Sequence, residues 1–205
     1  MGKRISVRKT VVFTIGHSTR TIEDFIEIIK AFGIKQVVDI RTIPRSRYTP
    51  QFNEDTIRES LKAVKIGYLH MKGLGGLRHA LKDSLNSGWE NASFRGFADY
   101  MQTGDFDESL EKLIETAAKR ATVIMCAEAV PWRCHRSLVG DALLIHGVQV
   151  RDIMSVNSSR DHILTPWAKV KEKKIIYPSE LGAQETAKPI KAKPGIMLPV
   201  RRISQ

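Results

Sequence analysis

Residues 121–146 read ATVIMCAEAVPWRCHRSLVGDALLIH, and this stretch decides the fold. The apolar run 122–126 predicts a buried strand, residues 137–146 have the spacing of an amphipathic helix, and a short polar turn separates the two. A strand, a turn and a helix start in this order are typical of α/β proteins, which bind ligands at the carboxyl ends of their strands. The turn region holds both cysteines, a carboxylate, a histidine and two arginines. We therefore expect a functional site here.

Strand-like and helix-like segments alternate along the rest of the chain. Short apolar runs predict strands, and apolar residues at helical spacing between capping residues and glycines predict helices. The expected strands are residues 11–15, 36–40, 67–70 and 149–154, and the expected helices are residues 21–33, 53–64, 94–101 and 105–119. Strands separated by helices predict a parallel sheet covered on both faces. We expect a single Rossmann-like, three-layer α/β domain with a mostly parallel sheet of about five strands and an irregular C-terminal arm.

Basic residues are concentrated at the two ends of the chain. Of the net charge of +11, residues 169–205 carry +6 and residues 1–10 carry +4, which leaves about +1 for the middle. We expect a basic extension over 1–10, the α/β domain over 11–168, and a basic, proline-containing tail over 169–205. The termini are expected to contact nucleic acid weakly, and the tail to pack on a second copy of the chain. Solvated tails are the alternative. Within the tail, the apolar residues 175–177 are the one fragment that indicates a strand.

Several protein classes do not fit the sequence. No run of about 18 apolar residues predicts a membrane span, and no basic-then-apolar leader predicts secretion, so we expect a cytoplasmic protein without membrane contact. In that compartment, where disulfides are rare, we expect the two cysteines to be free thiols, metal ligands or redox-active groups. The glycine-rich residues 73–76 lack the spacing and position of a dinucleotide fingerprint, so we expect no NAD. We expect them to form a flap over the strand ends, together with Trp89 and Phe94 from the following segment. Residues 89–91 and 94–96 also offer aromatic and polar groups for stacking on a base, with packing in the core as the alternative.

Three loops should meet at one edge of the sheet, and the first follows residue 15. Gly16 permits a sharp turn there, and His17, Ser18 and Arg20 are placed to reach over the strand ends. We expect Ser18 and Arg20 to bind a ligand and His17 to carry a proton. The alternative is a capped helix start with a surface histidine.

The second loop is rich in arginine. It begins at Asp39 and contains Arg41, Arg45 and Arg47. Guanidinium groups suit phosphate and carboxylate because they donate two parallel hydrogen bonds. The three arginines, together with Asp39, are therefore predicted to line an anion site. The alternative is that Arg41 pairs with Asp39 or Glu128 to build the sheet edge.

The third loop contains the two cysteines. Cys134 precedes a helix start, a setting that lowers the pKa of a thiol, and is therefore predicted to be a nucleophile. Glu128 is expected to act as a base or orienting acid and His135 as a proton carrier. Cys126, Cys134 and His135 are also a candidate metal site, although their spacing is not that of a zinc ribbon. Two cysteines that merely pack are the remaining alternative.

Several short motifs in one order resemble those of a known family. The motifs are residues 14–20, residues 38–46, Leu74-Gly75-Gly76, Cys126-Ala127-Glu128 and Cys134-His135-Arg136. Their series is similar to that of the domain of unknown function 488 family, over residues 11 to 162 or 168. The resemblance implies an α/β fold with a Rossmann-like sheet and places the family's motif residues on the three loops. It implies no particular reaction, and it does not extend to residues 169–205.

Together these observations predict an enzyme, a hydrolase or transferase, that binds an anionic, phosphate-bearing ligand such as a nucleotide or nucleic-acid component. Arg41, Arg45 and Arg136 are expected to hold the anion. The expected catalytic groups are Cys134, Glu128, His17 and His135. One alternative is a non-catalytic nucleic-acid binding module, and a second is a metal-binding protein that uses Cys126, Cys134 and His135.

Overall fold

A six-stranded, mostly parallel sheet forms the centre of the computed structural model, which describes residues 10–179. The strand order is β3-β2-β4-β1-β5-β6, and only β6 is antiparallel to its neighbour. The strands are β1 (Val11–Gly16), β2 (Gln36–Asp39), β3 (Gly67–His70), β4 (Thr122–Cys126), β5 (Gln149–Ser155) and β6 (Ser158–Asp161). The predicted α/β class is confirmed, with one strand more than expected. β6 was missed because its polar sequence, SSRD, shows no apolar alternation.

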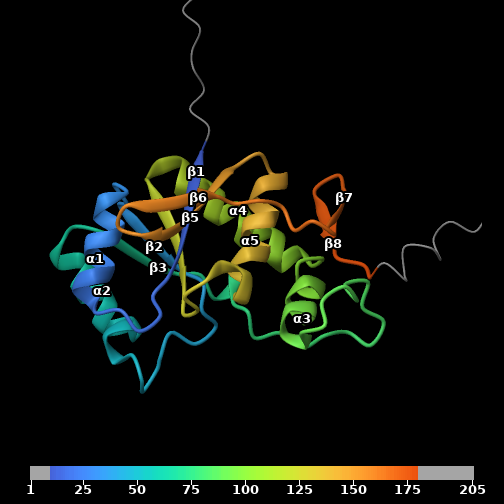
Figure 1. Cartoon of the computed structure of the whole chain (residues 1–205), viewed down its shortest axis with the longest axis horizontal. Coiled ribbons are helices and arrows are strands. Elements are labelled where there is room, and N and C mark those ends of the chain that lie inside the picture. Colours follow the sequence, from blue (N-terminus) through green and yellow to red (C-terminus); the bar gives the residue numbers. More distant parts are fainter. Residues whose placement is uncertain (1–9, 180–205) are drawn as a thin grey trace, which may run out of the picture.

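Helices cover both faces of the sheet (Figure 1). They are α1 (Ile22–Ala31), α2 (Glu54–Ala63), α3 (Ala92–Tyr100), α4 (Gly104–Lys119) and α5 (Arg136–Ile145), with short 3-10 turns η1 (Pro50–Phe52), η2 (Lys72–Leu74) and η3 (Pro131–Arg133). One core lies under α1 and α2, and a second lies under α3, α4 and α5. No helix within residues 10–179 is long and apolar enough to cross a membrane.

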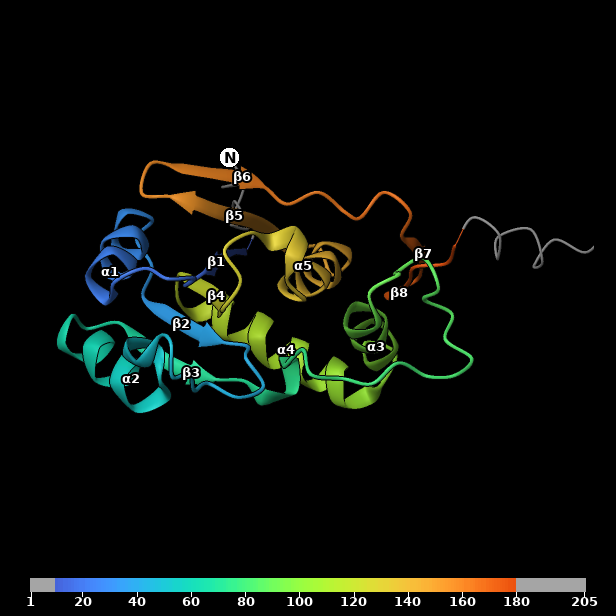
Figure 2. The same ribbon diagram turned by 60° about the horizontal axis from the view of Figure 1, so that its bottom comes forward.

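The order of the strands creates a crevice at one edge of the sheet. The chain passes from β1 to β2 through α1 on one face, and from β4 to β5 through α5 on the other face (Figure 2). In the sheet, β4 lies between β1 and β2. Its crossover to β5 therefore runs in the opposite direction to the crossover that leaves its neighbour β1 for β2. In open α/β sheets such a switch point leaves a crevice at the carboxyl ends, where ligands bind. The loops after β2 and β4 border the cavity found there.

Packed structure continues past residue 168, where we expected the domain to end. β7 (Lys169–Lys171) and β8 (Lys174–Ile176) form a small antiparallel hairpin. Ile175 and Tyr177 from this segment are buried in the core that α5 shares, and the Tyr177 hydroxyl donates to Asp141 at 2.9 Å. The fragment 175–177 was the one part of the tail that indicated a strand, and β8 confirms a strand there, although its burial in the core was not expected. The rest of the expected terminal arms, with their predicted nucleic-acid and oligomer contacts, lies outside the described residues.

Candidate functional site

One cavity, of about 370 Å³, opens at the carboxyl edge of the sheet. The loops after β2 and β4 border it, together with residues 76–77 and residues 91–94 at the start of α3. The sequence-predicted residues that line it are Arg41, Cys126, Glu128, Cys134 and His135. The structure therefore brings together the thiols, an imidazole, a carboxylate and one of the predicted arginines.

Backbone contacts hold the loop after β1 against the loop after β4. The amide of His17 donates to the carbonyl of Cys126 at 2.9 Å, and the amide of Ser18 donates to that of Ala127 at 2.8 Å. Gly16 makes this approach possible, because a Cβ at that position would overlap the backbone oxygen of Glu128. The floor of the cavity is thus an extension of the central strand pair.

Cys126, Cys134 and His135 form a compact cluster in the cavity, called here the cysteine cluster. The Nδ1 atom of His135 lies 3.9 Å from each sulfur. Its Nε2 atom lies 3.1 Å from the carbonyl oxygens of both Ile40 and Leu74. A carbonyl oxygen can only accept, so Nε2 carries the ring proton and the lone pair of Nδ1 faces the thiols.

The two thiols differ in acidity. A hydrogen bond from Cys134 lowers the pKa of Cys126, against the opposing effect of burial. The pKa of Cys134 is raised, because its thiol donates to Cys126 and because it is buried. The lowered pKa expected for Cys134 is therefore found at Cys126 instead.

Arg41 is bound mainly to the protein. Its guanidinium forms an ion pair with the buried Asp39, with Nε 2.9 Å from Oδ1, and also donates to the carbonyl oxygen of Phe52 at 2.7 Å. Tyr68 donates to the same carboxylate at 2.7 Å. The alternative in which Arg41 pairs with Asp39 at the sheet edge is thus present, and the pair leaves little free charge for a ligand.

His17 lies outside the cavity lining and is fully engaged. Its ring stacks on Phe52 with centroids 4.2 Å apart, its Nδ1 lies 2.9 Å from the Ser18 carbonyl oxygen, and its Nε2 lies 3.2 Å from Arg41. Burial lowers the pKa of His17 to about 4. The predicted proton carrier is therefore a neutral ring that supports Arg41.

The other predicted anion ligands do not converge on the cavity. Arg136 is buried and donates to the carbonyls of Glu128 and Ala129, and Arg20 donates to those of Gly16 and Met154. Arg136 thereby holds the loop after β4 in place, and Arg20 joins the end of β1 to β5. Arg45 and Arg47 are exposed and do not line the cavity. Sequence spacing could not reveal these arrangements, because backbone carbonyls compete with ligands for a guanidinium.

Some lining residues were not singled out from the sequence. Arg133 is exposed at the cavity, next to Cys134, and Ser93 contributes a hydroxyl from the start of α3. For Arg133 the signal was its position in the loop after β4, and for Ser93 there was none. Asn91 and Phe94, which were expected to offer polar and aromatic groups near the strand ends, do line the cavity.

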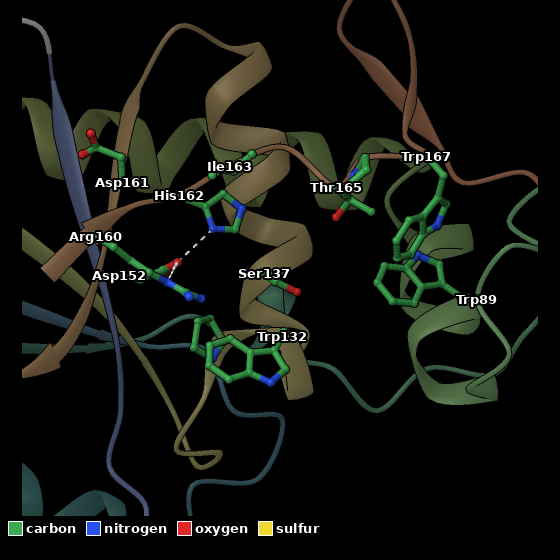
Figure 3. Close-up of a pocket in the computed structure, with 12 residues that line it drawn as sticks. Trp89, Trp132, Ser137, Asp152, Arg160, Asp161, His162, Ile163, Thr165 and Trp167 are labelled. Atoms are coloured by element: carbon green, nitrogen blue, oxygen red, sulfur yellow. Dashed lines mark hydrogen bonds and ion pairs between the residues drawn. The ribbon is translucent and has the colours of Figure 1, made fainter.

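A second cavity, of about 310 Å³, is lined by residues of η3, of β6 and of the segment that follows β6 (Figure 3). Three tryptophans line it, Trp89, Trp132 and Trp167, and the Arg160 guanidinium lies 4.6 Å from the ring centre of Trp132. His162 borders this cavity and bridges two buried carboxylates, with 3.2 Å to Asp152 and 3.1 Å to Asp141. No pattern in the sequence indicated this cavity.

Comparison with known proteins supports the family resemblance. A family model described as "Domain of unknown function DUF488" matches residues 21–143, which include β2, β4 and the cysteine cluster. Neither a curated protein nor a solved structure matches the chain.

Proposed function

The chain belongs to the family described as domain of unknown function DUF488, and from its cavity we propose that it is an enzyme acting on a small anionic ligand. One observation carries the proposal. Two thiols, an imidazole and a carboxylate line a single cavity at the switch point of a parallel sheet. This is where α/β enzymes bind their ligands, and the cavity volume lies in the usual range of about 300–1,000 Å³ for small-molecule sites.

The cavity lining supports a phosphate-bearing ligand such as a nucleotide or a nucleic-acid component. Arg133 supplies an exposed guanidinium, and Asn91 and Ser93 supply neutral polar groups at the start of α3. Phe94 offers an aromatic ring on which a base can stack. Arg41 adds positive potential that Asp39 largely offsets.

The reactive groups support a hydrolase or a transferase. Glu128 is exposed at the cavity and is the carboxylate there that can exchange a proton with a bound ligand. His135 cannot do so through Nε2, which two backbone carbonyls hold. A cytoplasmic location, where thiols stay reduced, is part of the proposal.

Isothermal titration of the full chain with nucleoside monophosphates and inorganic phosphate tests the proposal. We expect saturable binding that weakens about ten- to a hundredfold in Arg133→Gln, because a hydrogen bond to a charged group contributes about 1.5–3 kcal/mol. Arg47→Gln is the matched control, since Arg47 is an exposed arginine outside the cavity. The proposal fails if no small anion binds while oligonucleotides bind with a steep salt dependence, as a nucleic-acid binding module would.

A further inference from the structure

We infer that Cys126, Cys134 and His135 bind a zinc ion whose fourth coordination position opens into the cavity. The inference rests on the proposed function only for the catalytic role of the ion, because the metal site itself stands on the geometry of the three side chains. It goes beyond the family match, which names no ligand.

The three ligand atoms are arranged as a zinc ion requires. The two sulfurs and Nδ1 of His135 all lie within 4.8 Å of one another, with both sulfur-to-nitrogen distances at 3.9 Å. Around a tetrahedral zinc ion, with bonds of about 2.3 Å to sulfur and about 2.0 Å to nitrogen, neighbouring ligand atoms lie roughly 3.5–3.8 Å apart. The two sulfur-to-nitrogen distances must therefore shorten by about 0.4 Å, and the sulfur-to-sulfur distance, which is at most 4.8 Å, by at most about 1 Å.

The surroundings of His135 already hold the ring in the form that binds a metal. Its Nε2–H donates to the carbonyls of Ile40 and Leu74, which leaves Nδ1 unprotonated and directed at the sulfurs. The edge-on contact with Phe97, at 4.9 Å between ring centres, also restrains the ring. Such a hydrogen bond from the second ring nitrogen is the usual support of a metal-bound histidine.

Charge and burial favour the same assignment. Cys126 and Cys134 are only 6% and 3% exposed, a position in which an uncompensated thiolate is unfavourable. On binding, each thiol releases its proton to solvent, and two thiolates, a neutral imidazole and Zn²⁺ form a complex with no net charge. Thiolate and imidazole ligands in a tetrahedral arrangement select zinc over magnesium or calcium.

The number of ligands makes this a catalytic rather than a structural site. Within residues 10–179, no fourth histidine, cysteine or carboxylate joins the cluster. Structural zinc sites use four protein ligands, whereas catalytic sites use three and keep one position for water or substrate. Glu128 lines the same cavity as the ligands and is placed to orient such a water. The cysteines then act as metal ligands, and neither is a free nucleophile.

Elemental analysis and cobalt substitution of the full chain test the inference. We expect one zinc per chain after purification without chelators. After zinc removal, Co²⁺ should give the sulfur-to-cobalt charge-transfer band and the intense visible bands of a tetrahedral thiolate site. Cys126→Ser, Cys134→Ser and His135→Gln should each weaken Co²⁺ binding, on the order of a hundredfold. His79→Gln, which removes an exposed histidine outside the cluster, should bind normally.

A thiol assay keeps the inference falsifiable if a variant fails to fold. In the native wild-type chain both thiols should resist modification and become reactive when a chelator is added. Two freely reactive thiols, or a Cys126–Cys134 disulfide, in a chain that takes up neither Zn²⁺ nor Co²⁺ would overturn it. Nucleotide binding to such a metal-free chain would leave the proposed function standing. Stoichiometric zinc without binding of any small anion would instead remove the proposed function and keep the metal site.

Discussion

Gly76 packs against the imidazole ring of His135 in the cysteine cluster. A Cβ on Gly76 would overlap Nδ1 of His135, and two backbone carbonyls prevent the ring from moving aside. We expect Gly76→Ala to lower the free energy of unfolding by about 1–3 kcal/mol, as overpacking does. Urea denaturation measures the change. Gly104→Ala is the control, because no atom lies within 4 Å of its Cβ position and alanine favours a helix. Equal effects of the two substitutions would contradict the prediction.

Individual residues also show how far sequence reasoning reaches. Cys126, Glu128, Cys134 and His135 meet in one cavity because they belong to the end of β4 and the loop after it, and Arg41 joins them because β2 ends at the same edge of the sheet. The partners of the arginines do not follow in the same way. Arg136 bonds to the carbonyls of its own loop, a contact that depends on a turn conformation which residue spacing does not determine. The flap expected at residues 73–76 is likewise a fixed element, since Leu74 is fully buried.

A buried charged network of Asp141, Asp152 and His162 joins helix α5 to the sheet. Burial alone would lower the pKa of His162, but hydrogen bonds to Asp141 and Asp152 and their charges raise it to about 9. Since this value exceeds the ordinary 6.5, the stabilisation is fully present below about pH 6.5 and is lost as the pH rises through about 9. It should amount to roughly 3 kcal/mol.

Urea denaturation of the wild-type chain and of His162→Gln between these pH limits measures the effect. The difference in free energy of unfolding between the two proteins should shrink as the pH rises, because only the wild-type chain loses a proton from this site. The comparison cancels the titration of groups common to both chains. A difference that stays constant with pH would mean that His162 is not charged in the folded state.

For the molecule as a whole, the sequence predicted the layers of the domain but not its full extent. Alternating apolar segments correctly predicted the parallel strands and the helices on both faces, because burial on both sides leaves a strong pattern. β6 and β7 carry no such pattern, and in the last hairpin only β8 was indicated, by the apolar fragment 175–177. β6 is held by backbone pairing with β5, and the hairpin by two side chains, Ile175 and Tyr177, within a basic segment.

The hairpin's contribution to the whole domain gives the last prediction. Ile175 is 2% exposed and belongs to the core shared with α4 and α5, so Ile175→Ala removes buried apolar volume far from the sheet. We expect it to lower the free energy of unfolding by about 2–5 kcal/mol in denaturant titrations. Val170→Ala, in the exposed strand of the same hairpin, should change it by less than about 0.5 kcal/mol. Only a segment that shares the core transmits such a loss to the cooperative unfolding of the domain. If Ile175→Ala had as small an effect on the free energy of unfolding as Val170→Ala, the hairpin would therefore not belong to the domain, which would end near residue 168.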